Sequence, residues 1–167
     1  MSKNKIIIHT DGSSLGNPGP GGWAAVLQSG DHEKEISGGY RKTTNNRMEL
    51  MAVIEALKTI KKKSMEIDIH TDSNLIVNTI NQGWMESWKK KGWKKSNKKP
   101  VLNQDLLMIL DEQLKGLRVR FHWIKAHAGH PENERCDELA KAAAEKATEI
   151  DYEYEKSISD SNSLSAF

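Results

Sequence analysis

Hydrophobic and polar positions follow two different periods along this chain, and together they predict an α/β fold. Five short segments rich in β-branched or aromatic residues are typical of strands, over residues 6–11, 23–28, 33–40, 65–72 and 118–124. Four longer segments repeat apolar residues at helical spacing, over residues 45–61, 73–82, 101–115 and 132–146. Because three strands precede the alternating helices and strands, we expect a mixed five-stranded sheet flanked by helices.

Two stretches interrupt this pattern. Residues 15–22, LGNPGPGG, predict a turn, because two prolines and four glycines sustain neither a helix nor a strand. Residues 151–167 are rich in serine and acidic residues and carry little apolar mass, which predicts a disordered C-terminal tail without chemistry of its own. We therefore expect one folded domain over residues 1–150.

Composition narrows the class of protein. The 167 residues suit one domain, and the single cysteine, Cys136, excludes an intrachain disulfide, as suits a reducing cytosol. No apolar run has the length of a membrane span or of a signal peptide. We expect a soluble cytoplasmic protein that does not bind membranes, and the sequence suggests nothing larger than a monomer.

The net charge of +2 conceals an uneven distribution. Residues 84–99, here called the basic segment, hold seven lysines against one glutamate, Glu86. The C-terminal residues 151–167 are acidic and cancel this charge in the total. The basic segment is a candidate surface for binding a polyanion.

One tetrapeptide occurs twice and draws attention to two aspartates. The sequence IHTD ends the predicted strand at Asp11 and again ends a predicted strand at Asp72. If these strands lie side by side and parallel, both carboxylates project from the same sheet edge, where open α/β sheets bind their ligands. A match of four residues by chance remains the alternative.

Glu49 is the most informative acidic residue. Around the helix predicted for residues 45–61 it shares a direction with Val53 and Leu57, whereas Arg47 falls on the other side. A carboxylate that points into a core is costly unless it is neutralised, paired or bound to a metal. The alternative is a glutamate that compensates the helix dipole in the first turn.

A fourth acid, Asp137, lies at the edge of the apolar face of the helix predicted for residues 132–146. Four acids from four elements could converge at one sheet edge, where they would repel one another without divalent cations. Oxygen ligands favour Mg²⁺ or Mn²⁺, and two such ions can promote hydrolysis of a phosphodiester. Spacing alone leaves open that these are four unrelated surface acids.

Four motifs stand out along the chain: TDGSSLGNPGPGGW (10–23), TTNNRMELMA (43–52), TDSN (71–74) and HAGHPENERCDELA (127–140). In order and spacing they resemble the motifs of the bacterial ribonuclease HI family, and the resemblance covers nearly all of residues 6–147. The resemblance implies a ribonuclease H-like fold and an endonuclease that hydrolyses the RNA strand of RNA–DNA hybrids, leaving 5′-phosphate and 3′-hydroxyl ends. It also implies a two-metal mechanism, with two Mg²⁺ ions per site in the substrate complex and Mn²⁺ as a substitute. The family's acidic quartet corresponds to Asp11, Glu49, Asp72 and Asp137.

The histidines divide into two groups. His127 lies in a glycine-containing loop, and the resemblance implies that it assists water activation or product departure. A solvent-exposed loop histidine is the alternative. His9 and His70 precede threonines within strands, which favours packing or a supporting role.

Amide side chains lie beside the acidic positions, and an amide both donates and accepts, as recognition of a 2′-hydroxyl requires. The resemblance implies substrate contacts for Asn17, Asn45 and Asn46, although asparagine is also common in turns and caps. Asn74 stands where the family leads us to expect glutamine, so its contact is in doubt. Ala126 replaces a common glycine and could stiffen the loop before His127.

In the basic segment, tryptophans alternate with lysines. This pattern favours docking of a nucleic-acid backbone, and it corresponds to the family's basic protrusion, which helps to bind the DNA strand. The alternative is a solvated protrusion whose tryptophans pack against its own helix, and both can hold. The candidate substrate-binding residues are Trp84, Trp88, Lys89, Lys90, Lys91 and Trp93.

Three other functions compete with this interpretation. Integrases and junction resolvases have an acidic site but lack the long glycine-rich and ENERCDELA motifs. A non-catalytic hybrid-binding module would bind without turnover, against which the intact four acids argue. The nuclease domain of a reverse transcriptase is the third, but a freestanding enzyme is simpler for a chain with no polymerase portion.

Overall fold

The computed structural model describes residues 5–165, with the side chains of 161–165 excepted, and its elements follow the predicted order. Every predicted strand and helix has a counterpart. The strands are β1 (Lys5–Ser14), β2 (Gly19–Ser29), β3 (His32–Thr43), β4 (Glu66–Thr71) and β5 (Arg118–Trp123). The helices are α1 (Asn45–Lys58), α2 (Asn74–Asn81), α3 (Trp84–Lys90), α4 (Gln104–Leu114), α5 (Pro131–Glu145) and α6 (Tyr152–Ser165).

The strands form one mixed sheet in the order β3-β2-β1-β4-β5. β1 pairs with β2, and β2 with β3, in antiparallel fashion, whereas β1, β4 and β5 are parallel neighbours. The predicted mixed five-stranded sheet is therefore confirmed. Its parallel part brings the carboxyl ends of β1 and β4 to one edge.

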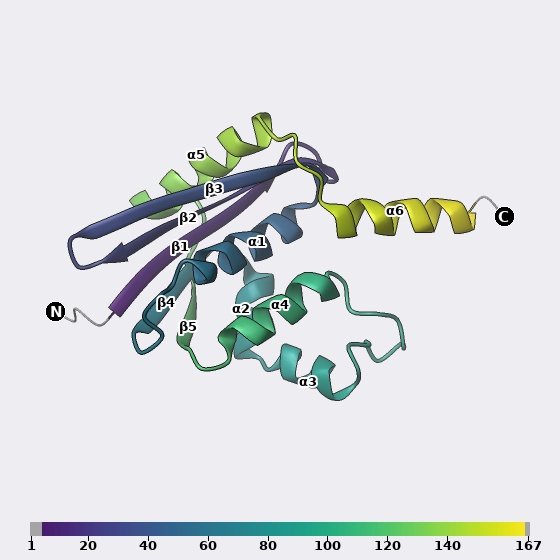
Figure 1. Cartoon of the computed structure of the whole chain (residues 1–167), viewed down its shortest axis with the longest axis horizontal. Coiled ribbons are helices and arrows are strands. Elements are labelled where there is room, and N and C mark those ends of the chain that lie inside the picture. Colours follow the sequence, from purple (N-terminus) through teal and green to yellow (C-terminus); the bar gives the residue numbers. More distant parts are fainter. Residues whose placement is uncertain (1–4, 166–167) are drawn as a thin grey trace.

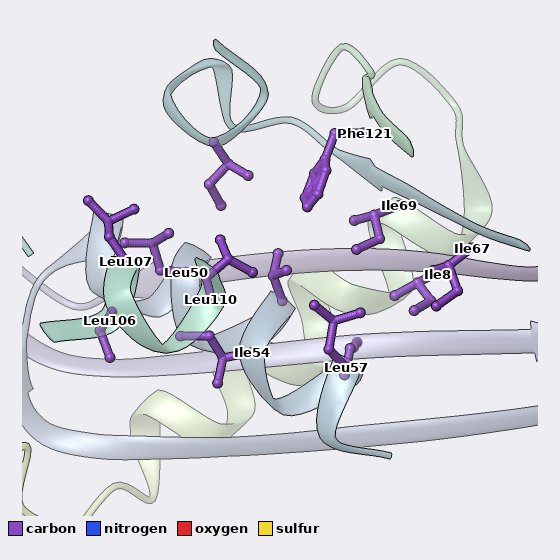
Figure 2. Close-up of a cluster of buried hydrophobic side chains, with 14 of the residues drawn as sticks. Ile8, Leu50, Ile54, Leu57, Ile67, Ile69, Leu106, Leu107, Leu110 and Phe121 are labelled. Atoms are coloured by element: carbon purple, nitrogen blue, oxygen red, sulfur yellow. The ribbon is translucent and has the colours of Figure 1, made fainter. Parts of the chain in front are cut away.

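Helices cover both faces of the sheet, as Figure 1 shows. α5 packs on β1, β2 and β3, where Ala24, Val26, Cys136 and Ala140 form a small buried cluster. α1 packs on the opposite face against β1 and β2, and α4 packs on α1. The main hydrophobic core lies between the sheet and α1 and α4, and Figure 2 shows its aliphatic side chains together with Phe121.

The turn predicted for residues 15–22 is wrong in its second half. Leu15 N–H donates to the carbonyl of Pro20 at 2.7 Å, but β2 already begins at Gly19. Gly22 pairs with both β1 and β3, and a Cβ on it would collide with the backbone of Ala140. Gly22 therefore allows the close approach of α5 to the sheet.

The C-terminal segment also differs from the prediction, because Tyr152–Ser165 form the helix α6 where the composition predicts a disordered tail. Its start is tied to the domain: the Asp151 carboxylate is buried against Arg47 and Thr43, and Arg41 forms an ion pair with Glu155. Beyond this attachment α6 extends away from the body of the molecule (Figure 1).

Two smaller features complete the fold. The basic segment contains the short helix α3, which the spacing of apolar residues does not predict. α4 begins at Gln104, three residues after the predicted start at position 101. Among the described residues, no helix combines the length and the apolar character needed to cross a membrane.

Candidate active site

The repeated tetrapeptide places two acids side by side. β1 and β4 are parallel and in register, so that His9 pairs with His70 and Thr10 with Thr71. Asp11 and Asp72 follow these pairs at the same sheet edge. The interpretation of the IHTD repeat as two adjacent parallel strand ends is confirmed.

Glu49 reaches the same edge from α1. Thr44 caps this helix, its hydroxyl oxygen accepting the Arg47 N–H at 3.2 Å, so that Glu49 lies in the second turn and faces the sheet. β1 and α1 meet here backbone to backbone: a Cβ on Gly12 would collide with the main-chain nitrogen of Glu49. The absence of a side chain at Gly12 therefore brings Asp11 close to Glu49.

Asp11, Glu49 and Asp72, here called the acidic cluster, form a tight group. One carboxylate oxygen from each lies within 4.8 Å of the others. Asp11 is only 5 % exposed and Glu49 only 6 %. Within residues 5–165 none of the three forms an ion pair, and Glu49 Oε2 has no hydrogen-bond partner. Buried carboxylates without cationic partners are unusual in a stable fold.

The acidic cluster binds protons more tightly than ordinary carboxylates do. Burial, followed by the charges of Asp72 and Asp137, raises the pKa of Asp11 to about 7. Burial and the charges of Asp11 and Asp72 raise the pKa of Glu49 well above its ordinary value, and burial also raises that of Asp72. Each shift reflects negative charge that lacks a counter-charge, which is the environment that a divalent cation stabilises.

The fourth acid lines the same cavity but lies outside the tight group. The cavity has a volume of about 500 Å³, and Asp137 lines it from α5 together with Lys141. Lys141 Nζ lies 2.9 Å from Asp137 Oδ2, one helical turn away. The structure therefore brings all four predicted acids to one cavity. Among the residues that the structure describes, three of them have no ion-pair partner, and the fourth is paired with Lys141.

Three of the four predicted amides line this cavity. Asn45 and Asn46 come from the first turn of α1, and Asn74 from the first residue of α2. Asn17 is exposed in the turn before β2 and does not line the cavity, although its Oδ1 accepts the Asn45 N–H at 3.1 Å. Asn17 is thereby linked to the start of α1.

His127 lies on the rim of the cavity, exposed to solvent, with a backbone φ of 55° in the left-handed region. The rings of His9, His70 and His122 instead stack in a row across three adjacent strands. The ring centroids of His9 and His70 are 4.9 Å apart, and those of His70 and His122 are 4.8 Å apart. Burial, followed by the charge of His70, lowers the pKa of His9 to about 4. The structure therefore agrees with a packing role for His9 and His70.

The tryptophans of the basic segment differ in exposure. Trp88 and Trp93 are half-buried and pack against the main core. Trp84 is 40 % exposed, and its ring centroid lies 6.3 Å from that of Trp88. Packing thus accounts for Trp88 and Trp93, while Trp84 presents an exposed aromatic surface.

The three candidate lysines also differ. Lys89 Nζ lies 3.2 Å from a carboxylate oxygen of Asp111 and 3.4 Å from one of Glu86. Lys90 and Lys91 are exposed. The ammonium of Lys89 is therefore engaged within the protein, and the other two point their charge to solvent.

Sequence reasoning missed two residues beside the site, Trp123 and Lys141, and it missed the burial of Arg47 elsewhere on α1. Trp123, at the end of β5, donates its indole N–H to the main-chain carbonyl of Asp72 at 3.2 Å. Lys141 pairs with Asp137, and its spacing of four residues on a predicted helix was a readable signal. Arg47, expected on the solvent side of its helix, is instead buried. No signal local to residues 45–61 indicates this.

Comparison with known proteins places this arrangement in a family. A family model described as RNase H matches residues 3–145. The chain is 52 % identical over 144 residues to a ribonuclease H of Nitratidesulfovibrio vulgaris, which covers 86 % of this chain and 92 % of that protein. It is 52 % identical over 154 residues to a ribonuclease H of Escherichia coli O127:H6, covering 92 % and 98 %.

Solved structures agree with this assignment. LC11-RNase H1 in complex with an RNA/DNA hybrid is 30 % identical, with a TM-score of 0.65 over 84 % of this chain and 97 % of that one. LC9-RNase H1 is 28 % identical, with a TM-score of 0.72 over 89 % and 75 %. The fold and the acidic cavity thus define a ribonuclease H-like, metal-dependent nuclease. The chain belongs to the ribonuclease H family, as its motifs predict.

Proposed function

We propose that this protein is an endonuclease that hydrolyses the RNA strand of RNA–DNA hybrids and leaves 5′-phosphate and 3′-hydroxyl ends. The observation that carries the proposal is the acidic cluster, in which the buried Asp11 and Glu49 and the half-buried Asp72 have no cationic partner among the described residues. A binding module would gain nothing from such mutual repulsion, whereas a metal-dependent nuclease requires it. The named relatives and the hybrid-bound LC11-RNase H1 support the choice of substrate.

The residues present fit a pair of divalent cations. Asp11, Glu49, Asp72 and Asp137 offer only oxygen ligands, and the buried Glu49 Oε2 has no hydrogen-bond partner among the described residues. Oxygen ligands suit Mg²⁺, with Mn²⁺ as a substitute, and we propose two ions per site in the substrate complex. Cations bound there would lower the pKa of the attacking water and stabilise the departing 3′-oxygen.

The remaining cavity residues position the substrate and move protons. Asn45, Asn46 and Asn74 line the cavity, where their amides can both donate to and accept from a 2′-hydroxyl. Asn17 contributes by fixing the first residue of α1. Exposed on the rim, His127 can take up a proton from the attacking water or deliver one to the product. Its loss should leave part of the activity.

The basic segment is proposed to bind the DNA strand. Trp84 offers an exposed ring, and Lys90 and Lys91 offer free ammonium groups, while Trp88 and Trp93 hold the segment against the core. Lysine contacts to phosphate release counterions, so this part of the affinity falls with salt.

We further propose that the enzyme acts as a monomer in the cytoplasm. All four acids come from one chain, so the site requires no residue from a second copy. The buried thiol of Cys136 is the only one in the sequence, which suits a reducing compartment. Sedimentation at working concentration tests the monomer.

The decisive experiment is cleavage of end-labelled nucleic acids by the full chain. An RNA–DNA hybrid, duplex RNA, duplex DNA and both single strands are each incubated with Mg²⁺, with Mn²⁺ or with EDTA. We expect cleavage only of the hybrid's RNA strand, and only with a divalent cation. Binding of the hybrid without cleavage in either cation would make the protein a hybrid-binding module.

A matched variant links this activity to the site. Asp11→Asn keeps the size of the side chain but removes its charge, so cleavage should fall by at least about a hundredfold. Binding of the hybrid in the presence of a divalent cation should remain close to that of the wild type. Full activity of Asp11→Asn would overturn the assignment of the site.

Two lysine variants test the basic segment. Replacing both Lys90 and Lys91 with alanine should raise the Michaelis constant for the hybrid and reduce the slope of log affinity against log salt by about one per lysine. Lys89→Ala should change this slope less, because Asp111 and Glu86 already hold its ammonium. An unchanged slope in the double variant would remove the basic segment from the substrate interface.

A further inference from the structure

Lys141 differs from every other residue around the acidic cavity. In the described part of the chain it is the single lysine or arginine that lines the cavity. It lies on α5, one turn after Asp137, and its Nζ is 2.9 Å from Asp137 Oδ2. The lysine side chain is 55 % exposed and the aspartate side chain 22 %. The ammonium group therefore sits at the mouth of the cavity, on a stem that is free to move.

The ion pair makes Asp137 unlike the three other acids. In the part of the chain that the structure describes, Asp11, Glu49 and Asp72 have no cationic partner, whereas the carboxylate of Asp137 is already neutralised. A divalent cation that uses Asp137 as a ligand must therefore displace the lysine ammonium or share the carboxylate with it. Either way, the positive charge of Lys141 opposes cation binding.

We propose that Lys141 is an internal competitor of the divalent cation: it holds Asp137 in the cation-free enzyme and weakens cation binding at the Asp137 side of the cavity. This inference rests on the proposed function. Because the side chain is exposed and flexible, Lys141 leaves Asp137 when a cation arrives and extends its ammonium group into solvent, away from the cation. Lys141 thus positions Asp137 and sets the cation concentration that the enzyme requires.

The expected effect exceeds that of an ordinary surface pair. An exposed ion pair at this spacing changes an equilibrium by about twofold. Lys141 also faces a cavity lined by three further carboxylates, so removing its charge strengthens the field that attracts a divalent cation. We expect removal of the charge to tighten cation binding about 3- to 10-fold.

The test is isothermal titration of the full chain with Mg²⁺ alone and with Mn²⁺ alone, without nucleic acid. The series is Lys141→Arg, Lys141→Met and Lys141→Glu. Lys115→Met is the matched control, since Lys115 also forms a local helical ion pair, 3.0 Å from Glu112, on an exposed surface away from the cavity. Thermal unfolding checks that each variant is folded.

Affinity should follow charge: Lys141→Arg and Lys115→Met stay within about twofold of the wild type, Lys141→Met binds the cations more tightly, and Lys141→Glu most tightly. The inference is overturned if Lys141→Met has the wild-type affinity or a weaker one, or if Lys115→Met shifts equally. If the wild type binds neither cation and cuts no hybrid, the proposed function itself fails. Binding and cleavage by the wild type, together with an unchanged Lys141→Met, reject only the role of Lys141.

Discussion

Two buried charges lie two residues apart on α1, and their surroundings are opposite. Glu49 faces the sheet, where its neighbours Asp11 and Asp72 carry the same sign and Glu49 Oε2 has no hydrogen-bond partner within residues 5–165. Arg47, which is 4 % exposed, faces Asp105 and Asp151, and the three form the arginine cluster. One short stretch of helix therefore carries both an unpaired and a fully paired buried charge.

The arginine cluster satisfies its charges almost completely. Arg47 donates to both oxygens of Asp105, at 2.8 and 2.7 Å, and to both oxygens of Asp151, at 2.8 and 3.0 Å. The Thr43 hydroxyl donates to Asp151 at 2.7 Å. Although burial alone would raise it, the pKa of Asp105 is lowered, because Arg47 stabilises the ionised form. This geometry holds α1, α4 and the start of α6 together.

The difference between the two clusters gives a criterion for distinguishing structural charges from functional charges in this fold. Burial by itself does not distinguish them, since each cluster contains two buried charged residues. The two clusters differ in whether their charges are compensated. Residues of the protein neutralise the charges of the arginine cluster, whereas the charges of the acidic cluster are neutralised only by a ligand of opposite charge.

The largest effect is expected from Glu49→Gln. The amide keeps the shape of the side chain but removes a charge from the acidic cluster, so cleavage of the hybrid should fall by at least about a hundredfold. Without divalent cations, the same variant should be as stable as the wild type or more stable by about 1 kcal/mol, because a repulsion is relieved. Urea unfolding in EDTA and steady-state kinetics measure the two effects. If Glu49→Gln were active and destabilised, Glu49 would have the structural role that is assigned here to Arg47.

Arg47→Met should affect stability most. It leaves the buried Asp151 without its counter-charge, and breaking a buried ion pair in this way costs about 3–5 kcal/mol of unfolding free energy. Urea unfolding measures the loss. The control is Arg135→Met, because Arg135 also forms a two-point ion pair, with Glu35, but on the surface. That variant should stay close to the wild type, and an equal loss in both variants would show that the burial of Arg47 contributes nothing special.

The smallest effect is a pH dependence of opposite sign for the two clusters. Folding raises the pKa of Asp11 from 3.8 to about 7. The protonated carboxyl of Asp11 therefore stabilises the fold fully below its pKa in the unfolded chain. This stabilisation is lost as pH rises through its pKa in the folded protein. Without metal, the wild type should lose about 1–2 kcal/mol of unfolding free energy between about pH 5 and pH 7. Asp11→Asn should lose less. Asp105, whose pKa is lowered, contributes throughout this window and loses its contribution only in stronger acid.

Urea unfolding in EDTA across this pH range measures the slope of unfolding free energy against pH for the wild type and for Asp11→Asn. Adding a divalent cation should flatten the slope of the wild type, since the cation holds Asp11 ionised. Identical slopes for the wild type and Asp11→Asn would mean that Asp11 does not titrate as its burial indicates.

Much of the site is readable from the sequence because its signals are local. The repeated IHTD marks Asp11 and Asp72 as equivalent strand ends, which the structure places side by side in parallel strands, and the helical direction of Glu49 predicts that it faces the core. The arginine cluster has no such signal. The partners of Arg47 lie 58 and 104 positions away, and a helical projection without them places Arg47 on the solvent side. The same missing partner explains why the composition of residues 151–167 predicts a tail and not α6.

The glycine-rich stretch fails for a related reason. Glycine and proline predict a turn from local conformational preference, but Gly22 is required by α5, which lies more than a hundred positions away in the sequence. The local backbone preferences of glycine and proline do not indicate which distant helix packs against the position where a glycine lacks a side chain. Leu15 and Pro20, by contrast, are close in sequence, and the hydrogen bond between them does close the predicted turn.

The contact at Gly12 has a consequence for how the site tolerates mutation. The approach of Asp11 to Glu49 is set by main chain against main chain, because the missing Cβ at Gly12 lets β1 lie directly on the nitrogen of Glu49. Side chains elsewhere in the core can exchange volume with their neighbours, but no neighbour can give way here without moving a whole strand or helix. The spacing of the two carboxylates is therefore a property of the backbone, insulated from sequence drift in the surrounding core and dependent on one hydrogen atom at position 12.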